Sequence, residues 1–230
     1  MNPSSINTDI NKLCCELIRA NMGIDYNPSY FDSKEQLIHL KAKANLYEII
    51  SIPTLIERFK AFLEKKYFNC VLFDGSLIQF FYMFDSQNRI TNHRLCYIPC
   101  PVEITADEIE EYSLVGIINI IKDDQVELYS RLKNSSPIRF DFDVKNSSTC
   151  HPASHLTIIS DHCRIPVCSP MDPCGFVRFI LENFYDIKYL EEIGIDIKII
   201  KTLCSKNYNL FEKTIEDNHK KILHLNCNVV

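Results

Sequence analysis

Residues that could do acid–base chemistry or bind an anion gather between positions 137 and 185 of this chain of 230 residues. Within that segment, residues 138–144 read IRFDFDV, an alternation typical of a β-strand with one buried face. Arg139, Asp141 and Asp143 then share the opposite face. Two carboxylates placed in this way could hold a divalent metal or share a proton, and the arginine could clamp a phosphate. The alternative is a solvated strand face whose charges compensate one another.

A second predicted strand, over residues 155–159, adds an imidazole. If it pairs with the first strand and the polar faces match, His155 lies near Asp141 or Asp143. A carboxylate orients an imidazole and raises its basicity, so such a pair can act as a general base. The alternative is that His151 and His155 hydrogen-bond the backbone where a loop meets a strand. The candidate catalytic residues are therefore Asp141, Asp143 and His155, and the candidate anion-binding residues are Arg139, Arg164 and His151.

Metal and cysteine chemistry find less support in the sequence. Cysteines and histidines recur between positions 150 and 174, but without a C-x2-C pair or an H-E-x-x-H motif, so we predict no metal site. Cys163 lies between His162 and Arg164, whose charges would favour a thiolate, yet neighbours along a strand point to opposite faces. The triplet at 155–157 fits the H-x-[ST] signature of two-histidine phosphoesterases, but the second copy that they need is absent. The sequence identifies no cofactor.

The composition is that of a globular protein, with 46% hydrophobic and 24% charged residues. A net charge of −5 argues against a wholly basic surface for nucleic acid, although a local patch is compatible with it. The first residues show no secretory signal, and no apolar stretch reaches the length of a membrane span. Eleven scattered cysteines, an odd number, fit free thiols in a reducing compartment. We therefore expect a cytoplasmic protein that does not enter a membrane.

The elements that must position these residues begin with an N-terminal part, residues 1–66, that is predicted to be helical. Apolar residues recur with helical spacing over residues 10–18 and again over residues 55–63. A capping-box pattern that starts at Ser33 predicts a further helix over residues 37–44.

Residues 67–168 are predicted to be mainly β, with one helix. Asp74-Gly75 lies between two runs of strand-forming residues, which is a hairpin signal. Gln87-Asn88 marks the next turn, before a third strand over residues 94–98. These signals, together with the two strands of the candidate site, predict an antiparallel meander.

Helices are predicted on both sides of the candidate site. A capping box at Thr105 predicts the helix over residues 106–121, and residues 126–132 either extend it or form a strand. The C-terminal part, residues 170–225, is predicted to hold helices over residues 173–185, 196–205 and 210–223, the first of them capped by Asp172.

Together these elements predict an α+β fold in which N-terminal and C-terminal helices pack on an antiparallel sheet. No linker rich in Gly, Ser or Pro divides the chain, so we predict a single domain over residues 1–230.

Four segments resemble an uncharacterised bacterial family, a domain of unknown function of about this length. They are SPIRFDFD at 136–143, HPASHL at 151–156, CRIPV at 163–167 and FVRFILENFY at 176–185. Members of that family often read H-L-H where this chain has H-L-T at 155–157, which weakens any mechanism that needs a third histidine. Genes of the family resemble those of mobile elements and anti-phage defence clusters. The resemblance therefore implies work beside other protein subunits, and no particular activity.

Two functional hypotheses follow. The first is a non-enzymatic subunit of a multi-protein bacterial system, such as defence against phage, which would expose an apolar patch on its flanking helices for protein partners. The second is a small nuclease or phosphoesterase, with Asp141, Asp143 and His155 as its acid–base or metal groups and Arg139 and Arg164 as anion clamps. The second requires the five side chains to converge, with Asp141 in contact with His155.

Overall fold

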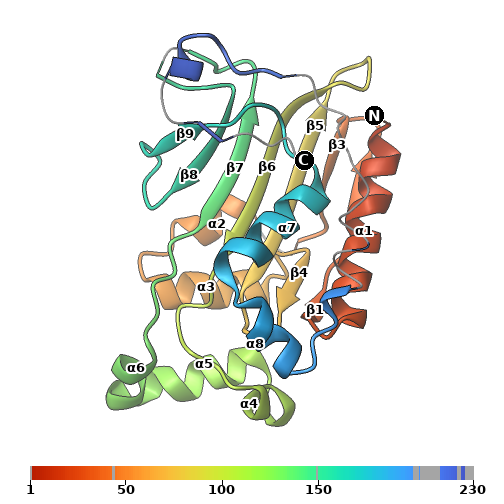
Figure 1. Cartoon of the computed structure of the whole chain (residues 1–230). Helices are drawn as coiled ribbons and strands as arrows, with labels where there is room; N and C mark the ends of the chain where they lie inside the picture. Colours follow the sequence, from red (N-terminus) through yellow and green to blue (C-terminus); the bar gives the residue numbers. More distant parts are fainter. Residues whose placement is uncertain are drawn as a thin grey trace.

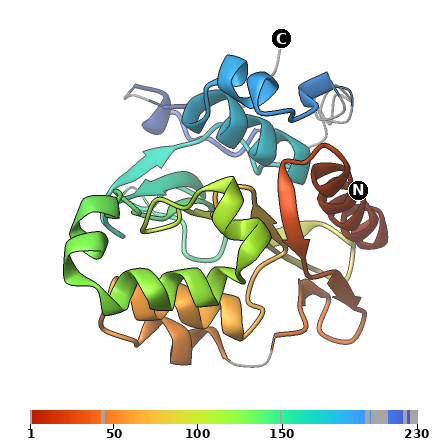
Figure 2. The same cartoon turned by 90° about the horizontal axis from the view of Figure 1, so that it is seen from below.

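An antiparallel sheet forms the middle layer of the protein, and helices cover both of its faces (Figure 1, Figure 2). The structure, a computed structural model, describes residues 2–42, 45–148, 150–198, 202, 213–221 and 224–225. The predicted α+β class is confirmed. Among the described helices, none combines the length and hydrophobicity that crossing a bilayer requires.

The sheet is a meander from β4 to β9, widened at one edge by three N-terminal strands. The strands are β1 (Gly23–Tyr26), β2 (Ser29–Asp32), β3 (Leu37–Leu40), β4 (Cys70–Leu72), β5 (Leu77–Phe84), β6 (Ile90–Ile98), β7 (Ile138–Asp143), β8 (Ser154–Ile158) and β9 (Arg164–Pro166). Strand β5 shares one edge between two partners, because β4 pairs with its first residues and β3 with its last. Every pair of strands is antiparallel, as the meander predicts.

The helices divide between the two faces. The first face carries α1 (Pro3–Arg19), α7 (Pro173–Phe184) and α8 (Ile187–Glu192). The second face carries α2 (Leu46–Ile50) and α3 (Leu55–Glu64). Helix α5 (Leu114–Asp123) packs on α3 and adds residues to the same core, with α4 (Ala106–Glu111) and α6 (Gln125–Arg131) on either side of α5 in the chain. Figure 1 places α4, α5 and α6 together beyond one end of the sheet.

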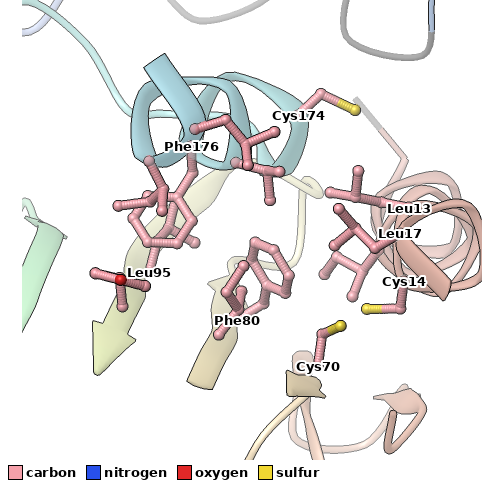
Figure 3. Packing of buried hydrophobic residues seen from close by; sticks show 14 of the residues in the cluster. Leu13, Cys14, Leu17, Cys70, Phe80, Leu95, Cys174 and Phe176 are labelled. Atoms are coloured by element: carbon pink, nitrogen blue, oxygen red, sulfur yellow. The ribbon is translucent and has the colours of Figure 1, made fainter. Parts of the chain in front are cut away.

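The core between the sheet and the first layer of helices is built around Phe176 of α7. Its ring meets Phe80 of β5 and Phe140 of β7 edge to face, with 6.0 Å between the ring centroids in each pair. Leu13 and Leu17 of α1 close the other side of this cluster (Figure 3). Burying each large apolar side chain contributes about 1.5–3 kcal/mol, so α1 and α7 hold this face of the sheet mainly by apolar contact.

The core on the second face is smaller and covers only part of the sheet. Its strand residues come from β4, β5 and β6, namely Val71, Leu77, Cys96 and Ile98. Strands β7, β8 and β9 contribute no residue to it. Polar side chains can therefore occupy this face of β7, β8 and β9, and the candidate site lies there.

Several predicted elements are confirmed. The Asp74-Gly75 and Gln87-Asn88 turns join β4 to β5 and β5 to β6, and the two strands of the candidate site are β7 and β8. Asp172 caps α7 by accepting a hydrogen bond from the amide of Gly175 at 2.9 Å. The nine described cysteines are free thiols, as expected.

The prediction of a helix over residues 37–44 is wrong for the described part, residues 37–42. Residues 33–36 form the turn of a hairpin, and Leu37–Leu40 is strand β3, which pairs with β2 and β5. Spacing of three residues between Leu37 and Leu40 fits a helix, but Ile38 lies fully buried against the sheet, and that tertiary contact outweighs the local pattern. The N-terminal part is therefore not wholly helical, because β1 to β3 lie within it.

The helices of the second half also differ from the prediction. The single helix expected over residues 106–121 is two helices. Helix α4 ends at Glu111, and Ser113 caps the start of α5 by accepting a 3.1 Å hydrogen bond from the amide of Gly116. Residues 126–132, left open between helix and strand, fall largely in α6, so residues 67–168 hold three helices rather than one.

Of the two helices predicted after residue 195, one is wrong in its described part and the other lies mostly outside the described residues. Within the predicted helix over residues 210–223, the described residues 213–216 are irregular and His219–Lys221 is a short 3-10 helix, so that prediction is wrong in the part described. Most of the helix predicted over residues 196–205 lies outside the described residues. Leu225 instead adds a bridge beside Val167, which follows β9.

A buried polar network joins the loop before α7 to the sheet. The Tyr82 hydroxyl donates to the Met171 carbonyl at 2.9 Å, and the Met171 amide donates to Nε2 of His93 at 3.0 Å. Since Nε2 accepts, the proton of the neutral ring lies on Nδ1. Burial lowers the pKa of His93 to about 4, so the ring stays neutral in the folded protein at neutral pH.

The His93 network predicts acid destabilisation within a defined pH window. Below a pH of about 6.5 the unfolded chain protonates His93 and the folded protein does not, so the free energy of unfolding should fall by up to about 3 kcal/mol as the pH approaches 4. Urea unfolding at pH 7 and pH 4.5 measures this loss. The His93→Gln variant should lose less between the two values than the wild type, while the exposed His162→Gln control should match the wild type. Equal losses in all three proteins would contradict the assignment.

Candidate functional site

The register of the sheet brings the predicted site residues together. Arg94 of β6, Asp141 of β7 and His155 of β8 are direct cross-strand partners. In the next row, Arg139 of β7 lies opposite Thr157, which lies opposite Arg164 of β9. Side chains directly opposite one another on one face have Cβ atoms about 4.5–5.5 Å apart. The contact between Asp141 and His155 that the hydrolase hypothesis requires is therefore present.

Asp141 is a buried carboxylate held by two arginines. It accepts a hydrogen bond from Nε of Arg94 at 2.9 Å and another from Nε of Arg139 at 3.2 Å, and only 10% of its side chain is exposed. Thr157 donates its hydroxyl from 3.4 Å. Burial opposes ionisation, but the charges of the two arginines outweigh it and hold the pKa of Asp141 below its usual value. The carboxylate is therefore an anion at neutral pH and a weak base.

His155 lies beside this carboxylate without a hydrogen bond to it. Its Nε2 is 3.9 Å from Oδ2 of Asp141, and its Nδ1 is 2.8 Å from the carbonyl of Pro152. A carbonyl only accepts, so Nδ1 carries the proton. Burial lowers the pKa of His155, and the ring of His151 packs against it at a centroid distance of 4.7 Å. The imidazole is therefore neutral at neutral pH and almost wholly enclosed.

Asp143 and His151 stabilise a loop instead of joining this cluster. Asp143 accepts hydrogen bonds from the amides of Lys145 and Asn146 and from the Asn146 side chain, which caps the turn after β7. His151 bonds through Nδ1 to the Asn146 carbonyl at 2.9 Å. The pairing of Asp141 and Asp143 that would hold a metal or share a proton is therefore not formed. In the part of the chain that the structure describes, no three His, Cys, Asp or Glu side chains gather as a metal site requires.

The arginines keep most of their donors available. Arg94 engages Asp141 through Nε alone, and 47% of its side chain is exposed. Arg139 uses Nε for Asp141 and one terminal nitrogen for Asp161, at 2.7 Å. Arg164 makes no side-chain hydrogen bond or ion pair with the residues described. We call these three arginines and Asp141 the arginine face.

Arg94 was not among the residues predicted for the site. It lies on a strand that the sequence does predict, but nothing near it in the chain marks it as functional. Its role depends on β6 lying next to β7 in a register that places Arg94 opposite Asp141. Alternation along β6 was the available signal, because Arg94 is the charged residue on the face that Cys96 and Ile98 share.

A second surface with unusual composition lies on the helices at the end of the sheet. Residues 103–133 carry eight Asp or Glu and three Lys or Arg, which gives the segment the same net charge of −5 as the whole chain. Large apolar side chains are exposed among these acids, namely Tyr112, Ile120, Val126, Tyr129 and Leu132. We call these five residues the α4–α6 surface.

Two of the three basic residues of this segment are already paired with acids. Arg131 forms ion pairs with Glu108, at 2.6 Å, and with Glu127, and Lys122 pairs with Glu57 of α3. Helix α6 buries no residue, and its Val126 and Tyr129 are 80% and 74% exposed. The α4–α6 surface is therefore both apolar and net acidic.

Comparison with known families gives one match. Residues 22–227 match the family described as "Uncharacterized conserved protein (DUF2290)". The match covers most of the chain, and the resemblance to an uncharacterised domain family is thereby confirmed. No curated protein and no solved structure matches the chain significantly.

The arginine face predicts a stability cost for removing its central anion. Asp141→Asn should lower the free energy of unfolding by about 2 kcal/mol, because the variant removes the negative charge between Arg94 and Arg139 and turns an NH2 donor, instead of an acceptor oxygen, toward one of them. Asp143→Asn is the matched control, since an amide oxygen can still cap the turn and the loss should stay below about 0.5 kcal/mol. Urea unfolding at pH 7 measures both. A larger loss for Asp143→Asn would contradict the central place of Asp141.

Proposed function

We propose that this chain, which belongs to the DUF2290 family of conserved proteins, is a non-enzymatic subunit of a multi-protein bacterial system that acts through protein partners, in defence against phage. The observation that carries the proposal is the α4–α6 surface, where large apolar side chains lie exposed among acidic residues. Exposed apolar patches of this kind mark binding sites for proteins. The role in defence rests on the resemblance given in the sequence analysis, since genes of that family resemble those of anti-phage defence clusters.

Helix α6 supplies the two most exposed residues of this surface, Val126 and Tyr129. A helix of seven residues is not stable by itself in water, so it is held by Leu128, which packs against the second core, and by the ion pairs of Arg131. Val126 and Tyr129 contribute nothing to that packing, because both point to solvent. Tyrosine is enriched in protein interfaces, where its ring becomes buried and its hydroxyl finds a partner. A partner would therefore bury the side of α6 that the fold leaves open.

The state of the polar residues on the sheet also supports a non-enzymatic role. The Asp141 carboxylate is engaged by two arginines, Asp143 caps a turn, and His155 is almost wholly enclosed. A general base needs a lone pair within reach of the substrate proton and a pKa near the working pH. Asp141 does not meet that condition, because two arginines engage its oxygens and hold its pKa below the usual value, and the oxygens of Asp143 are taken by hydrogen bonds of the turn, so the arrangement favours binding over hydrolysis.

The proposal predicts loss of the partner when α6 is altered. The chain, expressed with the products of its neighbouring genes, should retain a partner on purification, and the Val126→Ser, Tyr129→Ser double variant should recover about tenfold less of it. The control is Ile159→Ser, which alters an equally exposed apolar residue, 81% exposed, in the turn between β8 and β9. The control should recover as much partner as the wild type. Full recovery by the double variant would exclude this surface.

The second candidate function, a nuclease or phosphoesterase, is favoured by one observation, the direct pairing of Asp141 with His155. Under our proposal the purified chain should not hydrolyse a phosphodiester such as bis(p-nitrophenyl) phosphate, or a single-stranded oligonucleotide, with or without Mg²⁺. His155→Gln should leave both that result and the partner complex unchanged. Turnover by the wild type that His155→Gln abolishes, in a variant that keeps its partner, would establish the hydrolase instead.

A further inference from the structure

We propose that Arg94, Arg139 and Arg164 form a binding site for a phosphate group, with Asp141 as the residue that positions two of them. This inference is independent of the partner-binding surface, which lies on other elements of the fold. It rests on the register of four strands, the donors that the arginines leave open and the charge of the cluster.

The register places three guanidinium groups on one face of the sheet. Arg139 and Arg164 lie in one row with Thr157 between them, so two strand spacings, about 9.6 Å, separate their backbones. Arg94 lies one row away, on the other side of Asp141. Thr157 is short and turns its hydroxyl to Asp141, so the two arginines that flank it are the long side chains of that row.

The hydrogen bonds leave the ends of the arginines open. Asp141 takes the Nε donors of Arg94 and Arg139, so each side chain is fixed near its base. Within the described ranges, the terminal nitrogens of Arg94 make no hydrogen bond or ion pair. The guanidinium of Arg164 makes none either. Planar guanidinium groups with two open donors bind phosphate oxygens in pairs. Asp141 therefore holds two arginines for a ligand that it does not itself contact.

The charges of the cluster favour an anion. Three arginines face two acids, Asp141 and Asp161, and Asp161 is an exposed side chain on the turn between β8 and β9. The third acid on this face, Asp143, lies one row beyond Asp141 and turns its oxygens to the Lys145 amide and to Asn146. His155 is neutral at neutral pH, because burial lowers its pKa. The cluster thus has an excess positive charge, which a phosphate would neutralise, and Arg139 would exchange its contact with Asp161 for the ligand.

The surroundings favour a small phosphorylated ligand over nucleic acid. A nucleic-acid backbone is bound by a continuous basic surface, whereas this chain has a net charge of −5 and the three arginines of the cluster lie within two rows of the sheet. Phe81, the cross-strand partner of Arg94 on β5, is half-buried on the same face. Its ring could stack on a base, so a nucleoside monophosphate is the larger ligand that the site fits.

Titration calorimetry with inorganic phosphate tests the site. Wild type should bind, Arg94→Ala should bind about tenfold more weakly, and Arg89→Ala, which removes an exposed arginine of the turn before β6, should bind within about twofold of wild type. Asp161→Asn should bind about twofold to fivefold more tightly, because it releases Arg139. Circular dichroism confirms that each variant is folded, and Arg94→Lys keeps the charge while it removes the fork.

The outcomes separate the alternatives. A nucleoside monophosphate that binds more tightly than inorganic phosphate, with the gain lost in Phe81→Ala, identifies the nucleotide as ligand, and equal affinities identify phosphate alone. The proposal is overturned if wild type binds no phosphate at roughly 10 mM, a concentration that fills even a millimolar site. It is overturned equally if Arg94→Ala and Arg89→Ala weaken phosphate binding to the same extent. Tight binding of an oligonucleotide that depends on both Arg94 and Arg89 would also overturn it.

Discussion

The buried carboxylate of Asp141 is the interaction on which the outer half of the sheet depends. A carboxylate that is 10% exposed is costly unless opposite charges and hydrogen bonds compensate it, and Arg94 and Arg139 supply both. The compensation works in both directions, because the carboxylate also fixes two long side chains that would otherwise be mobile. Strands β6 and β7 are thereby joined through side chains as well as through their backbones, the Thr157 hydroxyl adds β8, and the arginines acquire a defined geometry.

The path of the chain explains why this face is polar at all. The connection from β6 to β7 contains α4, α5 and α6, and it places them beyond the end of the sheet instead of across it (Figure 1). Apolar cover on the second face therefore stops at β6, and β7 to β9 can carry charge there. The same connection leaves the outer side of α6 without a partner inside the chain. Both the arginine face and the α4–α6 surface thus follow from one topological feature.

The alternation of apolar and polar residues gave the most accurate part of the sequence-based prediction. The register between strands, which the sequence does not show, set its limit. The period of two along β7 and β8 separates core residues such as Phe140 from polar ones such as Asp141, and the structure has the same division. Arg94 could not be found in this way, because its importance comes from a strand 47 residues away in the chain. The hairpin of β2 and β3 was not predicted for a related reason. The four residues Leu37–Leu40 are too few for their pattern to distinguish a helix from a strand, and only packing against β5 decides between the two.

The geometry also separates two roles that the same residue types suggest in the sequence. Asp141 next to His155 resembles a general-base pair, in which the carboxylate would orient the ring through a hydrogen bond. Here the carboxylate is committed to arginines, the ring is oriented by the carbonyl of Pro152, and 3.9 Å separates the two groups. A carboxylate whose pKa is lowered by two arginines is a poor proton acceptor but a good anchor. Its value lies in the donors that it holds in place, and those donors suit the recognition of an anion.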